Sequence, residues 1–413
     1  VYQTFKNLAE SIRKNPRPIL VECNTFRLRG HEEASGTAYY PEGMIEEWTK
    51  QDPIANYEQF LLSEGILNQN LIEEIKESYK KQVEEALDQT IAEPEIIPNK
   101  KTELEDVYAP FDNHEILPQK LQNREIRFID AISEAIEISM KNHPNLVLMG
   151  QDIAEYGGAF KITEGFVEKF GKNRVRNTPL CEAAIVGSGL GLSINGYKSM
   201  VEMQFADFVT EGFNQIINNL AKTHYRWNQN ADVVVRMPTG AGTGAGPFHS
   251  QSNEAWFTKT PGLKIVYPAF PDDAKGLLIQ SFEDPNPVLF FEHKKLYRSL
   301  KGDVPEGFYT TPFGKARTVK EGNELTIITY GLGVHIALEF AEKNPEISLE
   351  IVDLRTLIPL DTETIYESVK KCNKVIILHE DTLTCGFGAE LSALISEHCF
   401  EDLDAPILRV ASM

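Results

Sequence analysis

The chain has 413 residues, of which 42% are hydrophobic and 25% are charged. This balance is typical of a soluble globular protein, and the length indicates two or three domains. Forty-one basic and 61 acidic residues give a net charge of −20, which argues against a nucleic-acid partner because phosphate contacts need a basic surface. No apolar run approaches the roughly 18 residues of a membrane span.

Cysteine usage indicates the compartment. The five cysteines stand far apart, and no C-x-x-C pair occurs. This is typical of reduced thiols in a cytoplasmic protein rather than of a disulfide framework or a zinc site. The chain opens on Val1 rather than Met, so we expect its true start to be missing.

The first block, residues 1–91, opens in a helical pattern and reaches a β-like run over residues 19–23. A charged loop with glycines follows over residues 27–36. Apolar residues then recur every four positions, which predicts an amphipathic helix packed on its own domain. These residues are Leu71, Ile75, Tyr79, Val83, Leu87 and Ile91. Residues 92–123 carry four prolines and little periodicity, and we interpret them as a linker.

The remaining sequence alternates helical stretches with short apolar runs, which predicts α/β domains with parallel sheets covered on both faces. The second block spans residues 124–303 and the third residues 304–413. A helix is expected from Phe128 to Ile136. The expected strands are 146–149, 232–236, 263–267 and 288–291, then 325–330, 349–353, 374–379 and 407–410. The chain stops after the last strand, so both ends look cut.

Two segments could carry chemistry. Glu182 opens a predicted helix that holds four glycines, Gly187, Gly189, Gly191 and Gly196. Glycines weaken helices, so we expect close approach by another element. The carboxylate could equally be a helix cap. Residues 240–246 are glycine-rich but match neither phosphate-binding motif, which favours a flexible loop that delivers His249 to a cleft. By itself, His249 is either a surface-loop residue or a catalytic one.

A third segment places Arg27 and His31 four residues apart on one loop, where they could meet an anionic ligand or be a solvated loop. Hydrolase motifs are not found: H-E-x-x-H does not occur, and the spacing around Gly187 does not fit a nucleophile elbow.

The second block contains four distinctive motifs: Asn177-Thr-Pro-Leu-Cys-Glu182, Gln204-Phe-Ala-Asp-Phe208, His249-Ser-Gln-Ser and Pro261-Gly-Leu-Lys-Ile-Val. These motifs resemble the beta chain of the thiamine-diphosphate-dependent 2-oxo acid dehydrogenases. The resemblance is closer to the branched-chain (2-oxoisovalerate) type. The resemblance covers residues 124–413. It implies a transketolase-like α/β fold with a parallel-sheet pyrimidine-binding domain and a smaller C-terminal domain that is truncated at its end.

Residues 1–91 resemble a different chain, the C-terminal part of the alpha subunit of the same enzyme. The resemblance rests on Phe26-Arg-Leu-Arg-Gly-His31, Glu47-Trp48 and Asp52-Pro-Ile54. It implies an alpha–beta fusion of which this sequence is a fragment. The family's Gly-Asp-Gly segment, which would bind magnesium and the diphosphate, is not found, so magnesium ligands are expected in a missing N-terminal part.

The resemblance also implies roles for individual residues. Glu182 matches the glutamate that hydrogen-bonds the cofactor aminopyrimidine, and a shielded carboxyl there could share a proton with the ring. His249 matches a histidine that assists acyl transfer to a lipoyl arm, and His31 matches a catalytic histidine beside Arg27 that faces the thiazolium and diphosphate. Other matched cofactor-binding positions are Leu180, Gln204, Phe208 and Glu155. A structural potassium site is implied at Ser281, Asp284 and Asn286.

The implied reaction is oxidative decarboxylation of a 2-oxo acid with acyl transfer to lipoyl-lysine of a partner dihydrolipoyl acyltransferase. Because the diphosphate half normally faces the beta domain across an interface, we expect at least a dimer. Three alternatives stay open: a pyruvate or acetoin dehydrogenase component, a transketolase or deoxyxylulose-phosphate synthase relative, and a non-catalytic subunit lacking the diphosphate site.

Overall fold

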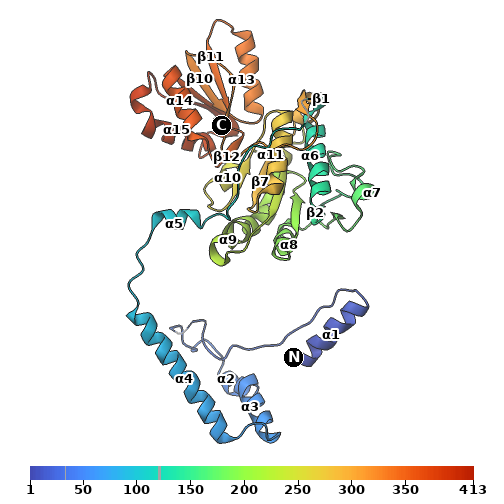
Figure 1. Cartoon of the computed structure of the whole chain (residues 1–413), viewed down its shortest axis with the longest axis vertical. Helices are drawn as coiled ribbons and strands as arrows, with labels where there is room; N and C mark the ends of the chain where they lie inside the picture. The colour runs from blue at the N-terminus through green and yellow to red at the C-terminus, as the bar shows by residue number, and fades with distance from the viewer. Residues whose placement is uncertain (33, 120–121) are drawn as a thin grey trace. The chain divides into compact units, whose positions relative to one another are not determined.

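The computed structural model describes residues 1–32, 34–119 and 122–413 (Figure 1). The chain divides into two units, Val1–Ile97 and Pro98–Met413, which are described separately below.

The first unit is helical, with α1 (Tyr2–Lys14), α2 (Met44–Thr49), α3 (Pro53–Ser63) and α4 (Gln69–Ala92). Local sequence sets the helix starts. Asp52 accepts hydrogen bonds from the amides of Ile54 and Ala55, and proline occupies the first helical position of α3. The predicted strand over residues 19–23 is wrong. These residues are irregular, since the described part of this unit holds no strand with which they could pair.

Helix α4 forms as predicted, but its predicted packing is wrong. Its only buried side chain is Ile72, whereas Tyr79, Val83 and Ile91 are 65%, 66% and 72% exposed. Residues four apart advance about 40° beyond a full helical turn, so the apolar stripe spirals around the helix and no single neighbour covers it. Helix α3 covers only its beginning, leaving an apolar groove of about 360 Å³ beside Ile72 and Ile75.

The predicted linker is only partly a linker. It holds a short helix, α5 (Lys100–Glu105), and the residues after α5 are bound to the main body. Ala109 is buried and exchanges two hydrogen bonds with the Asn286 side chain, at 2.8 and 3.0 Å. Asn113 exchanges two more with the backbone of Phe313, both at 2.8 Å. Segment 106–116 is therefore a strap across the second unit.

The larger sheet of the second unit has seven strands in the order β12-β6-β7-β5-β4-β2-β3. All neighbours are parallel except β12, which is antiparallel to β6. The strands predicted near residues 146, 232, 263 and 288 are confirmed. The bounds are β2 (Leu146–Gly150), β3 (Val175–Asn177), β4 (Lys198–Glu202), β5 (Val233–Thr239), β6 (Lys264–Val266), β7 (Val288–His293) and β12 (Thr356–Ile358).

Helices cover both faces of this sheet, as the continuous apolar runs predicted. One face packs against α6 (Phe128–Asn142) and α11 (Pro271–Glu283). The other packs against α8 (Glu182–Ile194) and the segment of η1 (Ala206–Gly212), η2 (Gln215–Leu220) and α9 (Ala221–Trp227). Shorter elements complete the domain: β1 (Asn123–Arg127), which pairs with β8 (Lys301–Pro305), α7 (Phe166–Phe170), η3 (Pro247–His249), α10 (Ala255–Thr258) and α12 (Leu296–Ser299).

The C-terminal domain has a second sheet in the order β14-β13-β10-β11-β9, with β9 antiparallel at one edge. Its four predicted strands are confirmed, and the antiparallel edge strand was not expected. The strands are β9 (Arg317–Lys320), β10 (Leu325–Thr329), β11 (Leu349–Asp353), β13 (Val375–Thr382) and β14 (Leu408–Ser412). The helices are α13 (Leu332–Lys343), α14 (Thr362–Cys372), α15 (Phe387–His398) and η4 (Phe400–Asp402).

A buried ionic network joins the three central strands of the larger sheet. Arg236 on β5 is fully buried, and it pairs with Glu202 on β4 and, at 2.6 Å, with Glu292 on β7. Tyr297 donates to the second oxygen of Glu292 at 2.6 Å. Burial disfavours the charged guanidinium, but the carboxylates of Glu292 and Glu202 outweigh it and raise the pKa of Arg236 well above its usual range.

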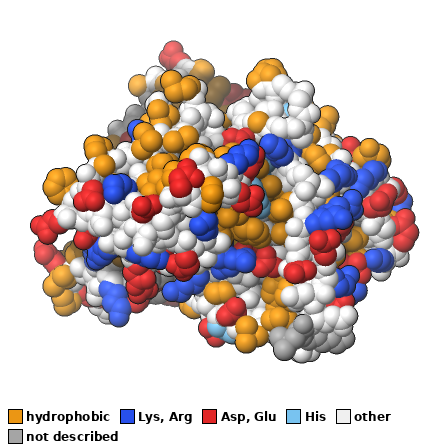
Figure 2. Space-filling view, turned by 90° about the horizontal axis from the view of Figure 1, so that it is seen from above, with side chains coloured by type: hydrophobic (Ala, Val, Ile, Leu, Met, Phe, Trp, Pro, Cys, Tyr) orange, Lys and Arg blue, Asp and Glu red, His pale blue; other side chains and the backbone are white. Residues whose placement is uncertain are grey.

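The net charge of −20 does not give one uniformly acidic face on the side drawn in Figure 2. On the face seen in Figure 2, acidic and basic side chains are interspersed, with hydrophobic side chains exposed between them. None of the helices over the described residues is both long and apolar enough to span a bilayer. Each of the five cysteines is a free thiol.

Replacing Arg236 by Met tests the buried network. R236M leaves two carboxylates buried without their cation, so we expect it to lower the free energy of unfolding by about 3–5 kcal/mol. The triple variant E202Q/R236M/E292Q removes all three charges and is expected to lose less. Urea unfolding followed by circular dichroism measures both, and a triple variant no more stable than R236M would contradict this account.

Candidate functional site

Candidate site residues gather where the parallel strands end. Gln151 follows β2, Gln204 follows β4, and Lys294 follows β7. The carboxyl ends of parallel strands form the ligand-binding edge of open α/β sheets. The Arg236 network joins β4, β5 and β7 near this edge, so it fixes the strand ends that precede Gln204 and Lys294.

Glu182 is the first residue of α8, and its carboxylate accepts a hydrogen bond from Gln151 Nε2 at 2.9 Å. It is therefore held by a side chain from the neighbouring strand end. The sequence prediction of a shielded carboxyl is only partly met, because Glu182 is half-buried in this chain. Gln151 was not predicted, and no pattern around it distinguishes it from a buried strand residue.

The structure explains the glycines of this predicted helix in different ways. A Cβ on Gly189 would lie 3.1 Å from Ser199 Oγ and from a Val201 methyl, so close approach to the sheet explains it, as predicted. Gly196 follows the helix at φ +79°, a conformation that favours glycine. A Cβ on Gly191 would meet no described atom within 4 Å, so the same reason does not apply there.

The other predicted ring-binding residues follow two different strands, Leu180 after β3 and Gln204 and Phe208 after β4. Leu180 is 81% exposed immediately before α8. Gln204 Nε2 donates to Asp152 Oδ2 at 3.4 Å, and half-buried Phe208 lies on η1. By chemical type, a carboxylate, an amide, an apolar side chain and an aromatic ring are groups that bind a flat, nitrogen-bearing heteroaromatic ring such as an aminopyrimidine.

Glu155, which the resemblance implied as a cofactor-binding residue, interacts instead with residues at the protein surface. Its side chain is 53% exposed and forms an ion pair with Lys172 at 2.6 Å, which is the main reason that its pKa is lowered. Asn177 also donates to it, at 3.1 Å. The structure thus gives Glu155 a surface ion pair in place of the pocket position that the resemblance implied.

His249 is delivered by a glycine-rich loop, as predicted. Gly240, Gly242, Gly244 and Gly246 all have positive φ, and residues 241–248 are exposed. The imidazole packs edge-on against two aromatic rings, Phe205 with a centroid separation of 4.7 Å and Phe208 at 5.5 Å. Its buried Nδ1 has no hydrogen-bond partner among the described residues.

Two residues that the sequence analysis did not single out support His249. Asp207 Oδ1 accepts from the amides of Ser250 and Gln251, both at 3.1 Å, and so fixes the backbone that follows the histidine. Lys294 is 4% exposed and lies 5.4 Å from the centre of the Phe205 ring. Burial lowers the pKa of Lys294 to about 8, although the Asp207 charge opposes this.

A buried acidic cluster lies between the two domains behind the loop. Glu254 is fully buried and accepts from Tyr330 Oη at 2.8 Å. Burial, reinforced by the Asp381 and Glu380 charges, raises the pKa of Glu254 to about 8. A carboxyl in this setting is protonated at neutral pH.

Arg27 and His31 belong to the first unit. Both are exposed, on a loop closed by Tyr40, whose hydroxyl donates to the carbonyls of Arg27 at 2.9 Å and Arg29 at 3.0 Å. Hydrogen bonding to Tyr40 and Tyr39 raises the pKa of Arg27. The loop thus presents a cation and an imidazole to solvent, as an anion site requires.

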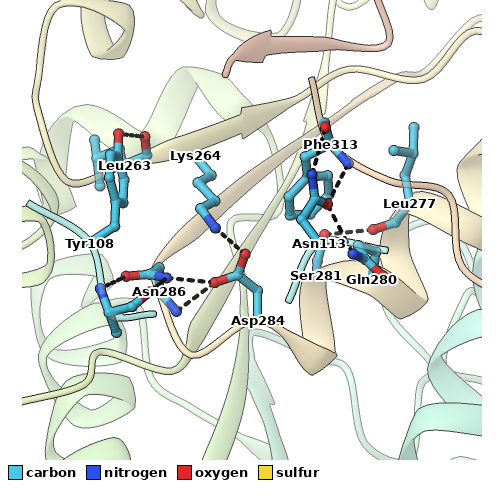
Figure 3. A network of polar contacts seen from close by, with 11 residues as sticks. Tyr108, Asn113, Leu263, Lys264, Leu277, Gln280, Ser281, Asp284, Asn286 and Phe313 are labelled. Carbon is cyan, nitrogen blue, oxygen red and sulfur yellow. Dashed lines mark hydrogen bonds and ion pairs between the residues drawn. The ribbon is translucent and has the colours of Figure 1, made fainter. Parts of the chain in front are cut away.

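The residues implied for potassium do not form a cation site. Figure 3 shows the Lys264 ammonium directed at the Asp284 carboxylate, where a metal ion would have to lie. Ser281 Oγ donates to the Leu277 carbonyl at 2.7 Å within α11, and the Asn286 side chain is used by Ala109 and Asp284. A lysine therefore already neutralises Asp284, and the residues do not fit the predicted ion.

The fold and these strand ends define a transketolase-like protein. The family model "Transketolase, pyrimidine binding domain" matches residues 124–299, and "Transketolase, C-terminal domain" matches residues 314–413. A solved structure described as "Split gene transketolase, inactive beta4 tetramer" superposes with a TM-score of 0.56 at 25% identity, over 69% of this chain and 88% of that one.

Closer relatives give the particular family. The 2-oxoisovalerate dehydrogenase subunit beta of Bacillus subtilis is 49% identical over 288 residues, 69% of this chain and 88% of the relative. The mitochondrial subunit of the same name from Dictyostelium discoideum is 44% identical over 70% of this chain and 80% of its own length. The pyruvate dehydrogenase E1 component subunit beta of Bacillus subtilis is 41% identical, over 70% and 90%.

The model "Dehydrogenase E1 component" matches residues 1–99. The chain belongs to the E1 components of the 2-oxo acid dehydrogenases, a family of oxidoreductases, and it joins an alpha-type C-terminal part to a beta-type part. The predicted resemblance and fold class are thereby confirmed. Both matched families depend on thiamine diphosphate.

Titrating Glu254 tests the buried cluster. Its folded pKa of about 8 lies above the ordinary 4.5, so its contribution to stability is full below pH 4.5 and is lost as the pH rises to about 8. E254Q does not titrate. Between about pH 5 and about pH 9, we expect the free energy of unfolding of E254Q to rise by about 4 kcal/mol relative to that of the wild type. One pKa unit corresponds to about 1.4 kcal/mol.

Urea unfolding at several pH values measures this difference. The matched control is E342Q, which changes an exposed glutamate of the C-terminal domain. Parallel pH profiles for the wild type and E254Q would show that Glu254 is ionised in the folded protein and would contradict this assignment.

Proposed function

We propose that this chain carries the beta-type half of the active site of a branched-chain 2-oxo acid dehydrogenase. The enzyme would decarboxylate a substrate such as 2-oxoisovalerate with thiamine diphosphate and pass the acyl group to a lipoyl-lysine. The observation that carries the proposal is Glu182, held by Gln151 at the ligand-binding edge of the sheet. The 49% identity to a 2-oxoisovalerate dehydrogenase beta subunit supports the substrate class.

Thiamine diphosphate, when bound, would supply the nucleophilic chemistry that a 2-oxo acid decarboxylation needs. The residues of this chain prepare its site. Glu182 shares a proton with a ring nitrogen, and the Gln151 amide fixes the direction of the carboxylate. Phe208 offers a stacking face, and Leu180, which is exposed in this chain, offers apolar contact to the same ring.

His249 has a separate role in the proposal. Its buried, unpartnered Nδ1 can hold or accept a proton beside the reacting groups, and its ring is fixed by Phe205 and Phe208. An imidazole so placed can assist acyl transfer to the dithiolane of a lipoyl arm by moving a proton. The lipoyl group would come from a partner dihydrolipoyl acyltransferase.

The first unit would contribute Arg27 and His31 toward the diphosphate side. In this family that side faces a beta-type domain across a subunit interface, so we propose self-association into at least a dimer. Magnesium ligands are not assigned, because the sequence holds no Gly-Asp-Gly segment. Free thiols throughout the chain support a cytoplasmic setting.

A pyruvate-type enzyme is the second candidate, and the 41% identity to a pyruvate dehydrogenase beta subunit favours it. The two candidates differ in the side chain of the 2-oxo acid. Comparing kcat/KM for branched and unbranched 2-oxo acids decides between them. A preference for pyruvate would replace the branched-chain assignment and leave the reaction class unchanged.

Replacing Glu182 tests the reaction class. In the complete enzyme, E182A removes the proton-sharing carboxylate, and we expect kcat for 2-oxo acid decarboxylation to fall at least about 100-fold. The control E168A changes an exposed glutamate of the same domain and should retain activity. Titration calorimetry with thiamine diphosphate and magnesium gives a second readout. Undiminished turnover by E182A would refute the proposal, and failure of the wild type to bind the cofactor would indicate a non-catalytic subunit.

A further inference from the structure

We propose that Glu380 of the C-terminal domain is a positioning residue for the His249 loop, so that the C-terminal domain sets the place of the histidine that assists acyl transfer. This inference rests on the proposed role of His249. Glu380 lies on β13, whereas His249 lies in the larger domain, on the segment between β5 and β6. The two are connected through the root of the glycine-rich loop.

Glu380 receives two hydrogen bonds from the larger domain. Oε1 accepts from the backbone amide of Ala241 at 2.5 Å, and Oε2 interacts with His293 Nε2 at 2.6 Å. The Lys295 amide donates to His293 Nδ1 at 3.3 Å, so Nδ1 is the acceptor and Nε2 carries the hydrogen that is donated to Glu380. Both carboxylate oxygens are thus used, one on the loop and one on β7.

The loop root packs directly on this pair. Gly240 has φ +83°, and a Cβ there would lie 2.1 Å from His293 Nε2. Its amide donates to the Gln251 carbonyl at 3.0 Å, and Thr239 Oγ1 donates to the same oxygen at 3.0 Å, which closes the mouth of the loop. His293 itself is fully buried, so the pair cannot move without moving the root.

Two carboxylates therefore hold the loop at its two ends. Glu380 holds the amide of Ala241 before the exposed tip, and Asp207 holds the amides of Ser250 and Gln251 after it. Between them, glycines at every second position remove side-chain restraint on the backbone. The position of His249 thus depends on its ring contacts and on these two clamps.

The charge on Glu380 suits the role. Burial opposes its ionisation, but the interaction with His293 and the hydrogen bond from the Ala241 amide, with a smaller contribution from Lys294, outweigh burial, and the pKa of Glu380 is lowered. An ionised carboxylate accepts at both oxygens, whereas an amide of the same shape accepts at one and places an NH₂ against the other donor. E380Q therefore breaks one clamp bond without a change in size.

The test compares E380Q with the wild type. Hydrogen exchange of the amides in residues 240–251, measured by mass spectrometry on the chain itself, should speed up about 10-fold. In the complete enzyme, acylation of a lipoyl domain should fall about 10-fold, while decarboxylation read with an artificial electron acceptor should change less than about 2-fold. The control E397Q, an exposed glutamate of the same domain, should match the wild type in all three measurements.

Variants of His293 give an independent reading. H293Q keeps an N–H donor for Glu380, so the amides of residues 240–251 should exchange nearly as slowly as in the wild type. H293L removes the donor, so these amides should exchange as fast as in E380Q. Unchanged exchange in both E380Q and H293L, or equal losses of decarboxylation and lipoyl acylation, would overturn the positioning role. If E182A retained turnover, the proposed reaction would be refuted. The hydrogen-exchange result would still test separately whether Glu380 positions the His249 loop.

Discussion

The buried pairing of Arg236 with Glu202 and Glu292 is the constraint on which the candidate-site edge of the sheet depends. A guanidinium can be buried only where carboxylates neutralise it and accept its hydrogens, so β4, β5 and β7 are locked side by side at their carboxyl ends. Candidate site residues follow these strands: Gln204 after β4, the His249 loop after β5 and Lys294 after β7. The buried ionic network thus keeps the ends of these strands, and the candidate residues that follow them, in fixed positions.

The Arg236 network fixes the strand ends, whereas the segments that follow the strands are held by side chains of other elements. The carboxylate of Glu182 takes its direction from Gln151, and the loop of His249 takes its ends from Asp207 and Glu380. Each support is a side chain that contacts a functional group or its backbone from another element. Because Glu380 belongs to the C-terminal domain, the smaller domain takes part in shaping the site as well as covering the sheet through shared apolar contacts.

The first unit follows a different physical logic. In helix α4, Ile72 is the only buried side chain, while a spiral of apolar residues remains exposed. A helix of 24 residues with so little burial gains little stability from its own unit, since most helical stability in proteins comes from packing. Residues 1–99 match the family model of the dehydrogenase E1 component. Its loop of Arg27 and His31 is ordered locally by Tyr40.

The sequence by itself determined the fold class, most strands and the family, because apolar runs and contiguous motifs are local patterns. The same motifs single out Glu182 and His249 as candidate site residues. It did not determine that Asp284 is neutralised by Lys264, that Glu155 pairs with Lys172, or that residues 106–116 form a strap held by Asn286 and Phe313. Nor could it find Gln151, Asp207 or Glu380 as supports. Each of these depends on which side chains meet across distant segments, and only the tertiary structure decides such meetings, since sequence spacing carries no information about the partner.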